Sequence, residues 1–459
     1  MNLSVINRLL LGGIILGYWI VGGLFAIRTP DWQAPDEPAH YNYVAQIAEQ
    51  GIIPVIEMGD WDNDYLEQLK SIRFDPAYLD AIHTVQYEDH QPPLYYLLLS
   101  PIYSLTDGSL TALRLFSVLI GTVMIISAYG IGMILYPNAS WIGLGAGAFV
   151  AFVPQHLAIL ASVNNDALGW ALMGLMLWAT AHYLKYDRVK AWHLGLLVGL
   201  GFITKATTYF MAGVVPLIIL LKWMQDTHPR NYRALIMQWA QFLIPALVLG
   251  LLWWMRNFDV YGFPDFMGLG AHDAVVFEQT RTAETIDAIG LSAYLEMGVN
   301  TTFNSFWGQF GWMAVPLQAR WYMVIDAILA VVVSGLAIRW YLLPSVGQVD
   351  GESEQADVAS ADRNIWIVLL LTIGLSIMAY IYYNVEFQQF QGRYMFTMLI
   401  PLGILFALGL DGWRQLITRW VKLPKRIESW VAYSMLVPFV VIALWDVWVL
   451  WRVIVPNLQ

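Results

Sequence analysis

An all-α membrane protein with many transmembrane helices is the fold class that three features of this sequence predict. Only 13% of its 459 residues are charged, about half the share of a soluble domain, and the mean hydropathy is +0.55. Apolar runs of about 20 residues, the length that spans a bilayer, recur along the chain. Its 22 Trp and 24 Tyr residues are typical of chains that cross many membrane–water interfaces. This composition excludes a cytosolic enzyme, a disordered chain and a nucleic-acid binder, and the absence of Cys excludes thiol chemistry.

Eleven apolar runs are predicted to be transmembrane helices. They lie at about 7–27, 110–135, 140–160, 165–184, 191–204, 207–224, 234–255, 321–343, 364–384, 394–411 and 430–451. The first run has no small-residue cleavage site, which favours an uncleaved span over a removed signal peptide. The apolar run 94–105 has only twelve residues and contains Pro101, so we expect it to lie in the membrane interface.

The distribution of Lys and Arg predicts the orientation. With the N-terminus in the cytoplasm, the loops at 185–190, 222–233 and 414–426 are cytoplasmic and hold eleven Lys and Arg residues, as the positive-inside rule requires. The polar, acidic stretch 344–363 reads as a flexible cytoplasmic linker. Residues 1–459 are thus expected to form a single multi-pass domain in the plasma membrane, with a cytoplasmic N-terminus and an extracytoplasmic C-terminus.

Two long loops face the extracytoplasmic side in this topology, and both are acidic. The first, 28–109, has a net charge of −11, and the second, 257–319, a net charge of −6. Because the whole chain carries −10, all the remaining residues together carry +7. The acidity therefore belongs to one face of the membrane, which marks that face as the place to look for carboxylate chemistry.

The first loop opens with an acidic pair, Asp36-Glu37, which is followed by Pro38. Proline fits the first turn of a helix, so residues 39–50 are predicted to form a short amphipathic helix on the membrane surface. The positive end of that helix would favour both carboxylates. An ordinary acidic N-cap explains the pair equally well when these residues are considered alone.

A second polar stretch, Tyr87-Glu88-Asp89-His90-Gln91-Pro92-Pro93, directly precedes the interfacial helix. Its proline pair gives a rigid start that places Asp89 and His90 at the membrane surface, although such a pair also begins ordinary helices. Arg114 follows at the outer edge of the second span. An arginine at that depth needs a carboxylate, a phosphate or water beside it, and a loop carboxylate is the ordinary explanation.

Taken in this order, the motifs resemble the GT-C superfamily of membrane glycosyltransferases. The resemblance is closest to the protein O-mannosyltransferase and lipid A aminoarabinose-transferase branch, which uses polyprenyl-phosphate sugars. Similar pieces recur to about residue 411, namely Asn164-Asn165-Asp166-Ala167-Leu168, Gly201-Phe202-Ile203-Thr204-Lys205 and Gln391-Gly392-Arg393-Tyr394. The sequence departs from this branch in two ways. We expect no appended soluble domain, and Gln91 stands where aminoarabinose transferases tend to carry Lys.

The resemblance implies a catalytic site built around Asp36. This residue would be the base that deprotonates an acceptor hydroxyl as it attacks the sugar C1 with inversion, and Glu37 would position the acceptor or pair with Arg114. Cations would bind the donor phosphate. Arg393 comes first, because Gly392 permits a close backbone approach, and the other candidates are Arg256, Lys205, Arg114 and Arg320. The alternative for each cation is a snorkelling side chain at a helix end.

The remaining polar residues of the motifs are expected to contact substrate; they are His40, Asp89, His90 and Gln91. Asp36, His40 and His90 also offer oxygen and imidazole ligands that suit Zn²⁺ or Mn²⁺, although a hydrogen-bonded histidine is the more ordinary explanation. No other cofactor is implied. The partners would be membrane lipids, a polyprenyl-phosphate sugar donor and an acceptor that is a lipid, a glycan or a protein.

Two other functions compete with the glycosyltransferase. A lipid or glycan flippase would require ionisable residues in mid-span and broken helices in matching halves, and the span middles here are almost free of charge. A non-catalytic subunit of a polysaccharide assembly system is not excluded by any residue. The second loop, which contains Pro264, Gly268 and Gly270, is predicted to act as a lid that orders on substrate binding over about 259–290.

Overall fold

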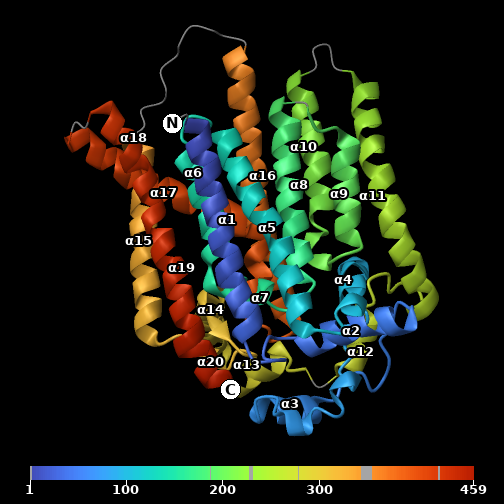
Figure 1. Ribbon diagram of the computed structural model, residues 1–459. Coiled ribbons are helices and arrows are strands. Elements are labelled where there is room, and N and C mark those ends of the chain that lie inside the picture. The colour runs from blue at the N-terminus through green and yellow to red at the C-terminus, as the bar shows by residue number, and fades with distance from the viewer. Residues whose placement is uncertain (1–2, 187, 227–230, 278, 343–353, 422–423) are drawn as a thin grey trace.

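A computed structural model describes residues 3–186, 188–226, 231–277, 279–342, 354–421 and 424–459. Long helices run side by side in a bundle, and the two chain ends marked in Figure 1 lie at opposite ends of it. Shorter helices gather at the end that holds the C-terminus, and we call this layer the cap. The cap comprises α2 (Glu37–Gln50), α3 (Asn63–Ser71), α4 (Leu94–Leu105), α12 (Leu269–Val275), α13 (Thr282–Ile289) and α14 (Leu291–Trp307).

Nine helical segments within the described residues are long and apolar enough to cross a membrane. They contain α1 (Leu3–Arg28), α5 (Leu110–Leu135), α8 (Asp166–Tyr186), α10 (Met211–Asp226), α11 (Tyr232–Tyr261), α15 (Ala319–Leu342), α16 (Glu354–Glu386), α17 (Leu399–Val421) and α19 (Val437–Val449). The last segment also includes part of α18 (Lys425–Tyr433), the short η5 (Ser434–Leu436), a π-helical turn (Leu450–Ile454) and α20 (Val455–Leu458). The all-α polytopic fold predicted from the sequence is confirmed.

The predicted number of eleven spans is too high, because two of the apolar runs are not continuous long helices. The run at 140–160 is a bent pair, α6 (Ser140–Phe152) and α7 (Pro154–Leu160), whose axes differ by 63°, so the described chain has nine spans, or ten if this pair counts as one. The bend falls at Pro154, the first residue of α7. The run at 191–204 forms α9 (Ala191–Phe202), whose twelve residues are shorter than a bilayer requires.

The two juxtamembrane helices predicted in the first loop are present as α2 and α4, and α4 has the predicted bounds. The predicted linker at 344–363 is partly wrong, because α16 already begins at Glu354. Residues 343–353 of that region lie outside the described residues. In the cap, a short antiparallel pair of strands, β1 (Gln309–Phe310) and β2 (Val315–Pro316), follows α14, while the 3₁₀ turns η1 (Pro76–Tyr78) and η2 (Ile82–Thr84) follow α3.

Small residues allow neighbouring spans to pack closely. At the crossing of α15 and α17, a Cβ atom added at Gly335 would collide with the backbone carbonyl of Gly409, so only glycine fits at this contact. Near it Asp411 accepts hydrogen bonds from Trp141, Arg339 and Arg414. These contacts fix the helices at the end of the bundle that lies away from the cap.

Candidate active site in the cap

Asp36 lies at the junction between α1 and α2, in a left-handed backbone conformation with φ 66°. Its carboxylate accepts a hydrogen bond of 2.8 Å from the Tyr87 hydroxyl and forms an ion pair with Arg393. The side chain makes no capping hydrogen bond to α2, so the N-cap explanation does not apply to it. Its side chain keeps 20% exposure, and the carboxylate is therefore held from two sides but is still accessible.

The electrostatic surroundings of Asp36 keep its carboxyl group ionised. Burial by itself would raise the pKa, but the nearby Arg393 charge, with smaller contributions from His40 and Tyr87, lowers the pKa of Asp36 to about 2. At neutral pH the group is therefore a carboxylate that can accept a proton.

A polar cavity of about 210 Å³ opens beside Asp36, between the two loops that the sequence analysis singled out. Its lining combines carboxyl groups, one Lys, amides and aromatic rings. The residues that define it include Asp36, Trp61, Lys70, Tyr87, Glu88, His272, Gln279, Trp312, Tyr383, Gln389, Gln391 and Tyr394. Carboxylates, amides and aromatic faces are the groups that bind sugar hydroxyls and sugar rings, so the chemistry of this cavity suits a carbohydrate.

Glu37 points away from the cavity and pairs with Arg114. The Glu37 side chain is 0% exposed, and its two oxygens lie 2.7 Å and 2.6 Å from Nε and Nη2 of Arg114. The remaining Arg114 donors reach the backbone carbonyls of Ala26, Thr29 and Pro30, and Glu37 also accepts from the Val163 amide. The sequence left two roles open for Glu37, and the structure shows the one in which it pairs with Arg114. The pair joins α1, α2, α5 and the loop before α8.

Arg393 enters the site from η4 (Gly392–Met398), the 3₁₀ segment before α17. A Cβ atom at Gly392 would collide with the backbone of Phe306, so glycine permits the close approach that the sequence suggested. Arg393 is 4% exposed, and its Nε and Nη1 have no hydrogen-bond partner among the described residues. Because a buried guanidinium ordinarily uses its donors, two of them remain for a ligand.

Lys205 is a second cation near this site. Its Nζ lies 2.6 Å from an oxygen of Asp166 and 2.7 Å from Oδ1 of Asn165. Asn165 in turn donates to Oε1 of Gln91, at 3.1 Å. The Gln91 position of the first loop is thus joined to Lys205 by one intervening side chain.

None of the five candidate cations is among the residues that line the polar cavity, and within the described residues Arg256 and Arg320 have no contact with Asp36 either. Arg256, on α11, donates to the backbone carbonyls of Ile53 and Pro54, at 3.3 Å and 2.5 Å. Arg320, at the start of α15, is exposed and lies over the Trp321 ring, 5.5 Å from its centroid. Their assignment to the donor phosphate stays a prediction, and neither residue lines the cavity.

The histidines predicted as metal ligands do not converge with Asp36. Nδ1 of His40 lies 2.8 Å from the Tyr96 hydroxyl, and the His90 ring packs against the ring of His272 with centroids 4.4 Å apart. Within the described chain no group of three or more His, Asp or Glu side chains is arranged to hold a metal ion. Burial lowers the pKa of His40 to about 3, with Lys205 adding to the effect, so the ring is neutral at pH 7.

Sequence reasoning did not select most of the residues that line the cavity, among them Lys70, Tyr87, Glu88, Trp61 and Tyr383. Tyr87 and Glu88 begin the stretch that also contains Asp89, whose Oδ2 accepts from Gln46 at 2.7 Å. The only sequence signal for Tyr87 and Glu88 was their position next to Asp89 and His90. Lys70 lies on α3 with its Nζ 4.6 Å from the Trp312 ring centroid, a contact between the two loops that no local pattern shows.

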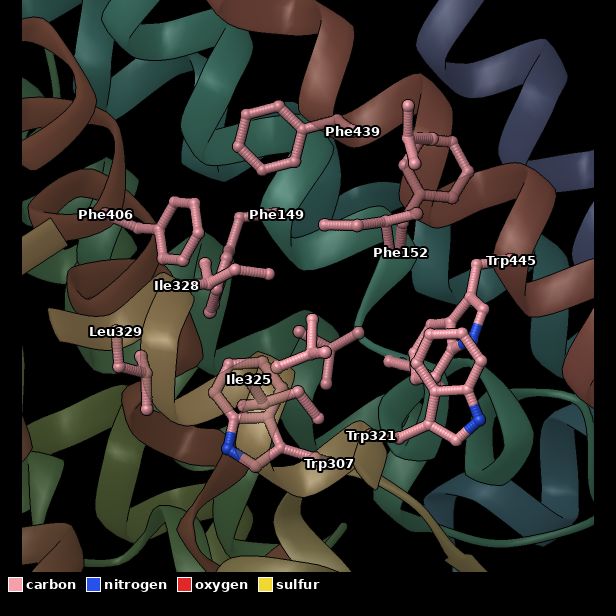
Figure 2. A pocket seen from close by; sticks show the side chains of 15 residues that line it. Phe149, Phe152, Trp307, Trp321, Ile325, Ile328, Leu329, Phe406, Phe439 and Trp445 are labelled. Carbon is pink, nitrogen blue, oxygen red and sulfur yellow. The ribbon is translucent and has the colours of Figure 1, made fainter. Parts of the chain in front are cut away.

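A second cavity, of about 250 Å³, lies within the bundle and is lined by apolar side chains (Figure 2). Phe149 and Phe152 of α6, Trp321 and Ile325 of α15 and Trp445 of α19 surround it. Such a lining accommodates hydrocarbon and offers nothing to a sugar. The polar and apolar spaces are thus separate in this molecule.

The chain and its structure were compared with known proteins in three ways. Residues 90–254 match the family model described as dolichyl-phosphate-mannose-protein mannosyltransferase. The structure of ArnT from Cupriavidus metallidurans in the apo state is similar, with 14% identity, a TM-score of 0.52, and coverage of 100% of this chain and 74% of that chain. The structure of the same protein bound to undecaprenyl phosphate has 14% identity and a TM-score of 0.48. That comparison covers 98% of this chain and 73% of the ArnT chain. The search of curated proteins gives no match.

The family match begins at His90 and ends at Trp254, so it includes the second polar stretch, Arg114 and Lys205 but neither Asp36 nor Arg393. The structural likeness extends over the whole chain and shows the fold. Residues 90–254 thus resemble the dolichyl-phosphate-mannose-protein mannosyltransferase family, as predicted from the sequence, and the whole chain shares the fold of ArnT.

Proposed function

We propose that this protein is a glycosyltransferase that transfers a sugar from a polyprenyl-phosphate donor to the hydroxyl group of an acceptor. The observation that carries the proposal is the ionised Asp36 at the edge of a polar cavity, paired with an arginine that has two unused donors. The match to a family named for a dolichyl-phosphate sugar supports the class of donor. A flippase or a non-catalytic subunit would leave this arrangement without a use.

Asp36 would act as the general base of a single displacement. It takes the proton of the acceptor hydroxyl while that oxygen forms a bond to the sugar C1, and the C1–O bond to the phosphate breaks from the opposite face with inversion. A group whose pKa is about 2 is ionised at any physiological pH, so the base needs no prior deprotonation. Its exposed fraction of 20% leaves room for the acceptor.

Arg393 would bind the donor phosphate with the donors that Asp36 does not use. A guanidinium can form parallel hydrogen bonds to phosphate oxygens, and both Nε and Nη1 are free for this among the described residues. Lys205, linked through Asn165 to Gln91, would supply a second positive charge. In this proposal Arg114 stabilises the fold and does not bind the phosphate, because it already donates its hydrogen bonds to Glu37 and to backbone carbonyls.

The orientation forms part of the proposal. The basic loops favour a cytoplasmic position for the end of the bundle that holds the N-terminus, which puts the cap and its cavity on the extracytoplasmic side. The helices α2 and α4 would lie at headgroup level, where the phosphate of a lipid-linked donor also lies. The second loop, which contributes His272 to the cavity, would act as the predicted lid.

A transfer assay tests the function directly. The purified full-length chain, in lipid nanodiscs, would be incubated with undecaprenyl-phosphate-linked hexoses and pentoses and with a membrane extract as the source of acceptors. We expect a new glycosylated product by mass spectrometry, with release of undecaprenyl phosphate. A cell that lacks the protein yet keeps all its lipid-linked and surface glycans unchanged would contradict the proposal.

Replacing Arg393 by glutamine should raise the donor KM at least about tenfold, because a charge-assisted contact to phosphate is lost. The substitution also removes the charge that lowers the pKa of Asp36. The acidic limb of kcat/KM should therefore move to higher pH, since the opposing effect of burial then dominates. Donor titrations at several pH values measure both effects.

The matched control for Arg393 is Arg188→Gln, an exposed arginine between α8 and α9. It should leave the donor KM and the pH profile unchanged. An Arg393→Gln enzyme with an unaltered donor KM would remove this residue from the phosphate site.

A further inference from the structure

The polar cavity contains a second carboxyl group, Glu88, which no step of the proposed mechanism uses. It comes from the tight turn before α4, where the backbone amide of Gln91 donates to the Glu88 carbonyl at 2.9 Å. The side chain lines the same cavity as Asp36. Its Oε2 is buried and has no hydrogen-bond partner among the described residues. Buried polar atoms ordinarily have a partner, so this unpartnered oxygen beside the cavity is a candidate for a ligand contact.

The two carboxyl groups of the cavity have opposite surroundings. Asp36 has a direct cation and a tyrosine hydroxyl, whereas the Glu88 carboxyl forms no ion pair within the described residues and its Oε2 has no hydrogen-bond partner there. The charged and titratable groups around Glu88 come from every neighbouring element. They are Asp36, His40, Lys70, Tyr87, Asp89, His90, Lys205, His272, Tyr383, Arg393 and Tyr394.

Burial and the nearby Asp36 charge raise the pKa of Glu88 to about 8, against the smaller opposing effects of Lys205, Gln91 and Arg393. The group therefore carries a proton at neutral pH, while Asp36 does not. Two carboxyl groups whose pKa values differ this far can serve as an acceptor and a donor within one site.

We propose that Glu88 binds the donor as a neutral carboxylic acid, donating a hydrogen bond to a phosphate oxygen of the polyprenyl-phosphate sugar. The inference rests on the proposed function. An anionic phosphate beside Asp36 would be repelled by a second carboxylate, whereas a protonated carboxyl removes that repulsion and adds a donor. The Glu88 oxygen Oε2, which has no partner among the described residues, is the atom that would carry this hydrogen bond.

Hydrogen bonds connect Gln91, three residues after Glu88, to the proposed phosphate cation Lys205. Asn165 donates to Gln91 at 3.1 Å, and Lys205 donates to Asn165 at 2.7 Å. Lys205 and Arg393 both act to lower the pKa of Glu88, so a phosphate bound by either cation would lie in the same part of the site as the Glu88 carboxyl. In these hydrogen bonds Gln91 accepts from Asn165. A lysine at the same position could not do so, since an ammonium group accepts no hydrogen bond.

The proton on Glu88 would have its largest effect while the sugar is being transferred. As the C1–O bond breaks, its electron pair goes to the phosphate oxygen, and the phosphate charge grows from −1 to −2. The acceptor oxygen bonds to C1 and its proton goes to Asp36, so atoms and charge balance without proton loss from Glu88. A hydrogen bond from Glu88 strengthens as that charge develops, which raises kcat as well as affinity.

A binding experiment tests the inference without knowledge of the sugar or the acceptor. The probe is a polyprenyl methyl phosphodiester, which carries one negative charge at every pH used, and its Kd for the full-length chain in nanodiscs is measured from about pH 6 to 10. Wild type should bind about tenfold more weakly as the pH rises through about 8, where Glu88 loses its proton. Glu88→Gln keeps an N–H donor, so it should bind well at every pH.

Three further variants complete the test. Glu88→Ala should bind weakly at all pH values, because it has no donor. Asp89→Asn removes the neighbouring carboxyl whose pKa burial also raises to about 8, and the alkaline weakening should remain in it. Glu49→Gln, a carboxyl on α2 that bonds Tyr103 away from the cavity, should behave as wild type.

The outcomes separate this inference from the proposed function. No binding of the probe by wild type at any pH would overturn the polyprenyl-phosphate donor itself. Binding that is independent of pH, or an alkaline weakening that persists in Glu88→Gln or disappears in Asp89→Asn, would overturn the role of Glu88 alone.

Discussion

Replacing Asp36 by asparagine is expected to abolish sugar transfer, with a fall in kcat of at least about 10²-fold, because the amide cannot accept the acceptor proton. The Asp36 carboxylate at the cavity edge is ionised, partly exposed and held by both Tyr87 and Arg393. Donor binding should change far less than kcat, since Arg393 keeps the two donors proposed for the phosphate. Single-turnover assays with a polyprenyl-phosphate sugar measure the loss.

The control for this substitution is Asp64→Asn, an exposed carboxylate on α3 of the same loop. It should keep the rate of the wild-type protein. If Asp36→Asn transfers sugar at an unchanged rate while its thermal unfolding matches that of wild type, Asp36 is not the base.

Breaking the pair between Glu37 and Arg114 is expected to destabilise the fold by about 3–5 kcal/mol, because the partner left behind is a buried, unpaired charge. Glu37 is 0% exposed and Arg114 is 1% exposed, and together they tie three helices to the loop before α8. Arg114→Met should thus lower the unfolding midpoint by more than any loop substitution. Thermal or denaturant unfolding in detergent measures the change.

A double substitution separates this charge effect from the general loss of packing. Glu37→Gln combined with Arg114→Met removes both charges, so it should recover part of the stability that Arg114→Met loses alone. The exposed pair Lys70–Glu67 provides the comparison, because Glu67→Gln should cost less than about 1 kcal/mol. Equal losses for the buried and the exposed pair would contradict the structural role of Arg114.

Local patterns predicted two of the six cap helices, α2 and α4. The twelve apolar residues of α4 start after a proline pair and form a helix with the predicted bounds, since length and flanking residues decide both. α2 begins at Glu37, two residues before the predicted start. The number of spans was wrong, because hydropathy counts apolar residues and does not register the bend at Pro154 or the early end of α9 at Phe202.

The site was only partly accessible to sequence reasoning. The motifs and the family resemblance singled out Asp36 and Arg393, and the structure brings the two into contact. Which way Glu37 would point could not be derived, because that depends on how α1 and α5 cross. The choice of Glu88 needed the cavity itself, since an acidic residue in an acidic loop carries no distinguishing pattern.

The contact between Asp36 and Arg393 joins residues that lie 357 positions apart, which has a consequence for biosynthesis. At about 5–20 residues per second, a ribosome adds Arg393 roughly 20–70 seconds after Asp36. Until then Asp36 has no guanidinium partner, so the nascent chain holds an incomplete centre through most of its insertion into the membrane. The protein would thus stay inactive during translation, and a chain that stops before Arg393 would lack one of the proposed phosphate contacts.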